Sequence, residues 1–134
     1  MDPKKLALLC REAADDKKAE DIVILDVRKL STVTDYFVIA SGLSEPHLRA
    51  ILDEITTTLQ EDHGVRPNAI DGSLQTAWMV VDYFDVIVHV MRRDLRERYN
   101  LEGLWNDAPL VKAKPPRKRA AAKPKPVKAG VVEA

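Results

Sequence analysis

Three histidines and one cysteine are the side chains in this sequence that most often bind metals or act as nucleophiles. A metal site on one helix or strand needs two such ligands a few residues apart, and no pair among His47, His63 and His89 has that spacing. The hydrophobic pattern places them in the first turn of a helix, at a helix end and in a strand. Cys10 falls on the apolar side of a helix, where a small core residue is expected. These residues therefore predict neither a metal site nor a catalytic centre.

Two carboxylates, Asp82 and Asp85, bracket a predicted turn and could hold a metal ion there. Aspartate is also common in turns because its side chain accepts a hydrogen bond from the backbone of the turn. The sequence contains neither G-x-x-x-x-G-K-[ST] nor G-x-G-x-x-G, the glycine-rich motifs that bind phosphate. It also lacks the D-x-D or D-x-E pair with which nucleotide-transferring enzymes hold metal and nucleotide. We therefore expect a protein that is not an enzyme and needs no cofactor.

The elements that must position these residues follow from hydrophobic periodicity and cap signals. Asp2-Pro3 predicts the start of a helix that ends near Lys17, and Ser44 and Gly64 bound a second helix. Apolar, β-branched runs predict strands at 22–27, 36–40, 75–82 and 85–91, the last two joined by a two-residue hairpin at Tyr83-Phe84. Residues 65–73 are expected to be a loop or a very short strand, and 92–99 a short helix. This order predicts an α+β fold, a mixed β-sheet flanked by helices.

The strand before the hairpin is apolar on both of its faces. Trp78, Val80 and Asp82 share one face by alternation, and the residues between them share the other. One face belongs to the core, and the other is covered either by a helix of the same chain or by a partner protein. Aromatic residues in a turn are unusual, so Tyr83 and Phe84 favour an exposed interface, where aromatic side chains supply much of the binding energy.

Charge is distributed unevenly along a chain whose formal net charge is zero. Residues 112–134 carry eight Lys/Arg and one acidic residue, or +7, so the remaining thirteen basic and twenty acidic residues give 1–111 a charge of −7. The length of 134 residues suits one domain, which we expect to span 1–111. The Lys-, Pro- and Ala-rich tail, 112–134, is expected to be disordered. A single cysteine and the lack of a long apolar run or a signal peptide favour a cytoplasmic protein.

Several segments in order resemble the ribosomal silencing factor family, also called Iojap-like proteins. They are 26–31 (DVRKLS), 34–42 (TDYFVIASG), Ser44 with His47, Trp78, 82–90 (DYFDVIVHV) and 98–109 (RYNLEGLWNDAP). The resemblance covers residues 3–110 and implies a nucleotidyltransferase-like fold without catalytic activity. It further implies a translational repressor that binds the large ribosomal subunit at ribosomal protein L14. Bound there, it would sterically block the small subunit and lower translation under nutrient limitation. A role in large-subunit biogenesis is also implied.

The resemblance places the partner-binding surface on the hairpin strands, at Trp78, Val80, Asp82, Tyr83 and His89. An aromatic anchor flanked by carboxylates suits a basic ribosomal protein. Relatives typically have glycine where this chain has Phe84. Because phenylalanine disfavours the positive φ of tight hairpins, we expect a wider turn or a turn of another type here.

The sequence is also compatible with two alternative functions, and the resemblance adds one assembly state. The chain could be a divergent nucleotidyltransferase-like enzyme that uses Asp82 and Asp85 with Mg²⁺. It could instead be an RNA-binding module in which the basic tail contacts rRNA phosphates. The resemblance also implies a homodimer when the protein is free of the ribosome.

Overall fold

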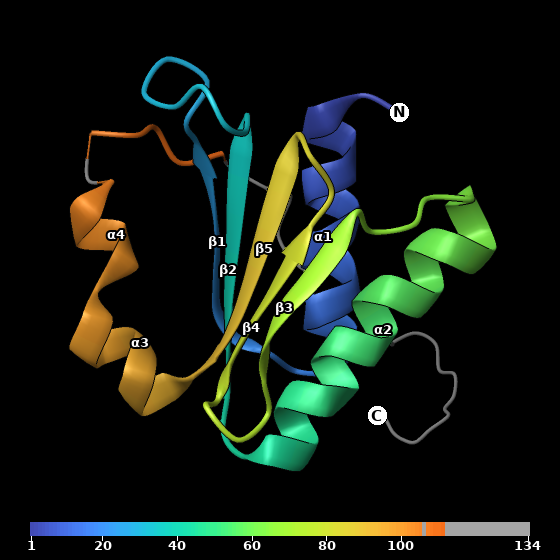
Figure 1. Cartoon of the computed structure of the whole chain (residues 1–134), viewed down its shortest axis with the longest axis vertical. Helices are drawn as coiled ribbons and strands as arrows, with labels where there is room; N and C mark the ends of the chain where they lie inside the picture. The colour runs from blue at the N-terminus through green and yellow to red at the C-terminus, as the bar shows by residue number, and fades with distance from the viewer. Residues whose placement is uncertain (106, 112–134) are drawn as a thin grey trace, which may run out of the picture.

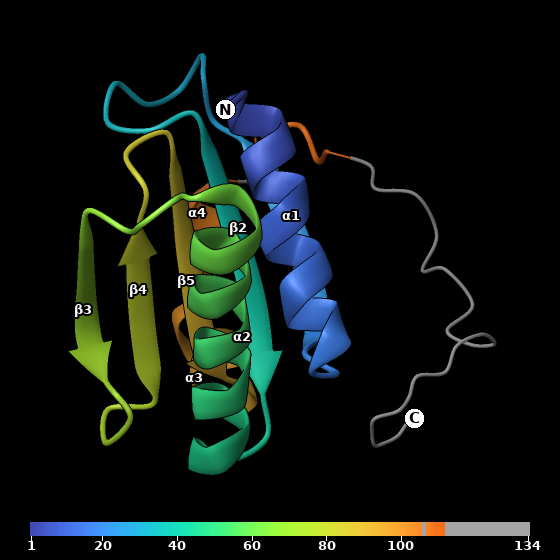
Figure 2. The ribbon, with the colours of Figure 1, turned by 90° about the vertical axis from the view of Figure 1, so that its right-hand side faces the viewer.

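The protein forms three layers in a computed structural model that describes residues 1–105 and 107–111 (Figure 1). Two long helices cover one face of the sheet, α1 (Pro3–Asp16) and α2 (Glu45–His63), and two short ones lie on the other, α3 (Arg93–Tyr99) and α4 (Leu101–Leu104). The strands are β1 (Glu20–Asp26), β2 (Tyr36–Gly42), β3 (Ala69–Ser73), β4 (Trp78–Asp82) and β5 (Val86–Arg92). Figure 2, turned by 90°, shows α1 and α2 side by side in front of the sheet.

The five strands form one mixed sheet in the order β1-β2-β5-β4-β3. The central pair, β2 and β5, is parallel, with Val38 opposite Val88, and the other neighbours are antiparallel. The predicted α+β class with a mixed sheet and flanking helices is therefore confirmed. The segment expected to be a loop or very short strand contains the five-residue edge strand β3.

Both long helices begin and end where their cap residues predict. The Asp2 carboxylate accepts a hydrogen bond from the Lys5 amide at 3.1 Å, and the Ser44 hydroxyl accepts one from the His47 amide at 3.3 Å. Gly64 ends α2 with a left-handed φ of 68°, a conformation that glycine adopts without steric penalty. These caps satisfy backbone groups that the helix itself leaves unpaired.

The core has two parts, one on each face of the sheet. Val38, Val81, Val88 and Val90 pack under the apolar stripes of α1 and α2. On the opposite face Leu25, Val27, Ile39 and Ala108 form a smaller cluster against which Phe37, Leu101 and Trp105 pack. This second cluster covers β1 and β2 but does not extend to β4. The chain therefore covers its own second face only in part.

The turn between β4 and β5 lies one residue later than predicted. The Tyr83 amide donates to the Val86 carbonyl at 2.8 Å, so Tyr83 is still paired and the two loop residues are Phe84 and Asp85. This shift turns the Tyr83 side chain toward the helices, where it is only 5% exposed and belongs to the main core. The expectation that Tyr83 is exposed is wrong. Phe84 is the exposed aromatic residue of the turn.

The predicted basic tail, 112–134, lies outside the described residues. Within the described residues, no helix has both the length and the apolar character that a membrane crossing requires.

Candidate partner-binding face

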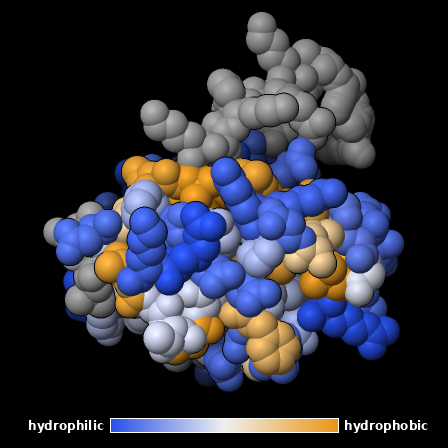
Figure 3. All heavy atoms as spheres, turned by 90° about the horizontal axis from the view of Figure 1, so that it is seen from above, coloured by the Kyte–Doolittle hydropathy of each residue, from blue (hydrophilic) through white to orange (hydrophobic). Residues whose placement is uncertain are grey.

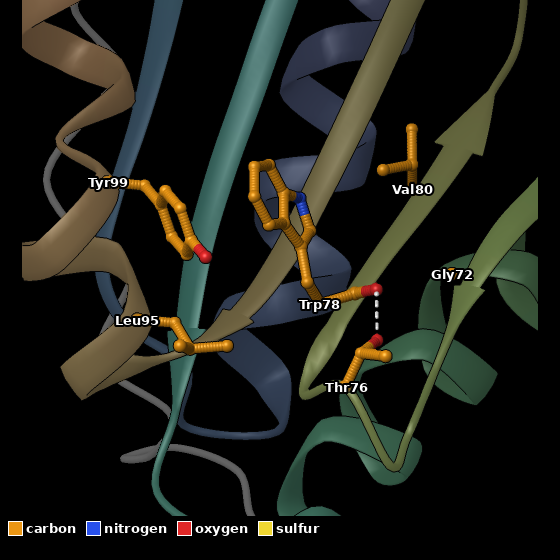
Figure 4. A pocket seen from close by; sticks show the side chains of 6 residues that line it. All are labelled: Gly72, Thr76, Trp78, Val80, Leu95 and Tyr99. Carbon is orange, nitrogen blue, oxygen red and sulfur yellow. Dashed lines mark hydrogen bonds between the residues drawn. The ribbon is translucent and has the colours of Figure 1, made fainter.

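The uncovered part of the second face is an open, largely apolar hollow between β4 and α3. It is lined by Gly72, Thr76, Trp78, Val80, Leu95 and Tyr99. Figure 4 shows the Trp78 indole from β4 turned toward the Tyr99 ring from α3, with Leu95 below them. The centroids of the Trp78 and Tyr99 rings lie 5.3 Å apart, a distance typical of attractive aromatic pairs. We call this surface, together with Asp82 at the end of β4, the docking face.

Hydrogen bonding and ring contacts fix the orientation of Trp78. Its indole N–H donates to Nδ1 of His89 on β5 at 3.1 Å. The His89 ring packs edge-on against the Phe37 ring, with their centroids 5.4 Å apart. The Phe37 and Trp105 rings pack in the same way, with their centroids 5.1 Å apart. A chain of rings thus connects the docking face to the part of the same face that Trp105 covers. A side chain held in this way loses little conformational freedom on binding a partner.

His89 is a neutral acceptor in this arrangement. Burial lowers the pKa of its imidazole from 6.5 to about 4. With Nδ1 accepting from Trp78, the ring proton lies on Nε2. The sequence alone places His89 on the face opposite Val88 and Val90, and the structure adds that it supports Trp78.

The stability of the protein should therefore decrease in mild acid because of His89. The folded pKa lies below the unfolded value, so the unfolded state takes up the proton first as the pH falls below 6.5. The free energy of unfolding should fall by about 1.4 kcal/mol per pH unit from pH 6.5 to about pH 4, and show no contribution from His89 above that range. Urea unfolding at a series of pH values measures this pH dependence of the free energy of unfolding.

His89→Asn is the matched control, because its amide oxygen can accept from Trp78 but does not titrate. Other acidic and basic groups contribute equally to both proteins, so the stability difference between them isolates His89. The free energy of unfolding of the wild type, relative to that of His89→Asn, should decrease steadily as the pH falls from 6.5. Parallel curves for the two proteins over this range would contradict the assignment.

The remaining histidines and the cysteine do not form a metal-binding group among the described residues. His47 Nδ1 accepts from the Leu43 amide at 3.0 Å, and its Nε2 lies 2.8 Å from the Lys17 carbonyl, which joins the end of α1 to the start of α2. His63 is exposed at the end of α2. Cys10 is buried in the core, and burial raises the pKa of its thiol to about 12. Among the described residues, no three His, Cys, Asp or Glu side chains gather into a group that could hold a metal.

The two aspartates of the hairpin bond to backbone groups, Asp82 through its carboxylate and Asp85 through its main-chain carbonyl. Asp82 Oδ1 accepts a hydrogen bond from the Phe84 amide at 2.7 Å. The Asp85 carbonyl accepts from the amides of Asp35 and Tyr36, at 3.0 and 3.1 Å, and so joins the hairpin to the start of β2. Asp82 thus has the backbone-bonding role that aspartate commonly has in turns.

Arg96 holds α3 in position, a role that the sequence does not indicate. Although charged, it is only 6% exposed. Its guanidinium donates to both carboxylate oxygens of Glu102, at 3.2 and 2.8 Å, and to the Ser41 hydroxyl on β2 at 2.9 Å. The bond to Arg96 lowers the pKa of the Glu102 carboxyl. Because α3 carries Leu95 and Tyr99, this network also positions these two residues of the docking face.

The chain matches a known protein family over almost its whole length. The model of the family described as "Ribosomal silencing factor during starvation", RsfS, matches residues 1–133. The chain belongs to the RsfS family. The resemblance in its sequence segments is thereby confirmed.

Relatives of known name and structure agree with this RsfS assignment. The ribosomal silencing factor RsfS of Bacillus subtilis is 43% identical over 111 residues, which are 83% of this chain and 93% of the relative. A mouse protein named "Mitochondrial assembly of ribosomal large subunit protein 1" is 34% identical over 94 residues, 66% of this chain and 40% of its own. A crystal structure from Chromobacterium violaceum has a TM-score of 0.75 at 33% identity, covering 92% of this chain and 98% of that one.

The structure places four of the five residues predicted for partner binding in this RsfS-family chain on one face of the sheet. Trp78, Val80 and Asp82 follow each other along β4, and His89 lies opposite Val80 on β5. Tyr83 lies on the other side, within the core. Leu95 and Tyr99 complete the surface but could not be placed from the sequence, because their helix has no strong apolar pattern.

Proposed function

We propose that this chain binds the large ribosomal subunit at ribosomal protein L14 and sterically blocks the small subunit. Such binding would lower translation in the cytoplasm when nutrients are limiting. The observation that carries the proposal is the docking face, a partly exposed aromatic and aliphatic surface on a chain of the RsfS family. The name of the mouse relative, which refers to assembly of the large subunit, supports the choice of subunit and a second role in its biogenesis.

The chemistry of the docking face suits a basic protein. Trp78 and Tyr99 offer large rings of low conformational entropy, which often contribute most of the energy of an interface. Asp71, opposite Val80 on β3, and Asp82 place carboxylates on the same face of the sheet. The −7 charge of residues 1–111 attracts basic ribosomal proteins and repels RNA phosphates. The contact of this domain is therefore with protein rather than with rRNA.

Steric exclusion requires an interface but no reaction. An interface of standard size, about 1,600 Å² in total, is enough to hold a domain on a ribosomal subunit. Two large particles cannot join while a folded domain occupies the surface between them. Silencing then depends only on the fraction of large subunits that carry the protein.

Co-sedimentation with isolated ribosomal subunits tests the proposal. The full chain should sediment with the large subunit and not with the small one, and it should reduce formation of joined ribosomes when both subunits are mixed. Removal of residues 112–134 should reduce binding only modestly and weaken its dependence on salt. Absence of binding to the large subunit would refute the proposed function. Complete loss of binding without the tail would favour the RNA-binding alternative.

A further inference from the structure

Phe84 combines an unfavourable backbone conformation with an exposed aromatic ring. Its φ is 71°, in the left-handed region that residues other than glycine rarely occupy. The Asp85 amide donates to the Tyr83 carbonyl at 2.9 Å, so the chain closes a γ-turn around Phe84. The side chain is 65% exposed, although phenylalanine is among the residues most often buried. Neither property benefits the folded monomer.

The surrounding structure holds Phe84 in this conformation. Asp82 accepts its amide hydrogen, and Tyr83 and Val86 close the hairpin beneath it. The Asp85 carbonyl, bonded to two amides at the start of β2, fixes the other side of the turn. Strained backbone that is fixed by so many neighbours is typical of functional sites. Glycine would take the same turn without strain, which indicates that the ring itself has a role.

The position of Phe84 connects it to the docking face. It directly follows β4, whose exposed side carries Trp78, Val80 and Asp82. Figure 1 shows this turn at the upper end of β4 and β5, beyond the part of the sheet that α3 and α4 cover. Figure 3 looks onto this end of the molecule, where apolar side chains form separate patches among charged ones. Phe84 thus lies just beyond Asp82, the docking-face residue at the end of β4.

We propose that Phe84 is a partner-contacting anchor of the docking face and binds the aliphatic part of a lysine or arginine side chain of the basic ribosomal protein. This inference rests on the proposed function. An exposed ring two residues from the Asp82 carboxylate suits such a side chain, because the ring contacts its methylene groups while the carboxylate attracts its charge. The −7 charge of residues 1–111 favours a basic partner at this site.

Substitutions at Phe84 separate the contact from the strain. Phe84→Gly should have a melting temperature at least equal to that of the wild type, because it relieves the positive φ, and should bind the large subunit about tenfold more weakly. Phe84→Ala, which removes the ring but keeps the strain, should lose the same affinity. Phe84→Tyr, which keeps the ring, should bind within about twofold of the wild type. Leu43→Ala, a change of an exposed apolar residue between β2 and α2, is the matched control and should bind normally.

Measurement of subunit affinity and melting temperature for the same set of variants tests whether the Phe84 ring contacts the partner. A Phe84→Gly protein that binds like the wild type would overturn the inference. If Phe84→Gly binds normally but Trp78→Ala does not bind, the proposed function stands and only the role of Phe84 is refuted. A wild-type chain that does not bind the large subunit would overturn both.

Discussion

Replacement of Trp78 by alanine should weaken binding to the large subunit at least about a hundredfold, equivalent to about 2.7 kcal/mol. Trp78 lies at the centre of the docking face, with Val80 beside it and the Tyr99 ring 5.3 Å away. Its truncation removes the largest apolar surface offered to the partner. It also leaves Nδ1 of His89 without its donor. Titration of labelled protein with purified large subunits measures the change.

Two further variants make the Trp78 result interpretable. Trp78→Phe keeps an aromatic ring but lacks the N–H that reaches His89, so it should lose less affinity than alanine. Ile70→Ala removes an exposed apolar side chain from β3, opposite Val81 and therefore on the other face of the sheet. It should bind as well as the wild type. A folded Trp78→Ala protein with unchanged affinity would show that the partner binds elsewhere.

Replacement of Arg96 by alanine should lower the free energy of unfolding by about 3 kcal/mol. The change removes a bidentate pair with Glu102 and leaves the fully buried Ser41 hydroxyl without its donor. Because α3 is only seven residues long, it depends on this packing rather than on its own helical propensity. Urea unfolding at neutral pH measures the loss. Subunit binding should also weaken, because Leu95 and Tyr99 are carried by the same helix.

Arg93→Ala is the matched control for Arg96. Arg93 lies on the same helix but is 55% exposed, and it pairs with Glu20 at 3.3 Å on the surface. Exposed ion pairs contribute little, so this variant should lie within about 0.5 kcal/mol of the wild type. Equal effects of the two substitutions would contradict the anchoring role of Arg96.

The helices could be predicted because their signals are local. Asp2 with Pro3, and Ser44 with Gly64, each act on backbone groups within a few residues, and the structure confirms both starts and the end of α2. The strand faces around Trp78 also follow from simple alternation. These features depend on neighbours in the chain and need no knowledge of the tertiary fold.

The predicted position of the turn between β4 and β5 was wrong by one residue, and this shift changes which side chains are exposed. Placing the turn at Tyr83-Phe84 rather than Phe84-Asp85 leaves Tyr83 in the exposed loop, whereas in the structure it is a paired strand residue whose side chain points to the core. Phenylalanine at positive φ runs against local preference, so local reasoning could not select this turn. The expectation was a wider turn or a turn of another type. The loop keeps two residues and is not wider, but the hydrogen bond from the Asp85 amide to the Tyr83 carbonyl makes it a turn of another type, with Phe84 at positive φ.

Arg96 was missed for a different reason. In sequence, 92–99 resembles a solvated helix of alternating charge. The burial of one of its arginines depends on Ser41 of β2 and on Glu102 of α4, which are brought together only by the tertiary structure. The same holds for the parallel pairing of β2 and β5. Contacts between distant segments decide which charged residue supports the docking face.

The parallel pair at the centre of the sheet also determines when the protein can fold during its own synthesis. β2 and β5 are paired from Tyr36–Val86 to Gly42–Arg92, so the middle of the sheet joins segments some fifty residues apart. A nascent chain that has reached only His63 contains β1, β2 and both long helices, but β2 then presents an unpaired edge and the core lacks the valines of β5. Such long-range pairing folds more slowly than local helical contacts. The protein therefore becomes stable only after Arg92 has been translated, and an incomplete product is prone to aggregation.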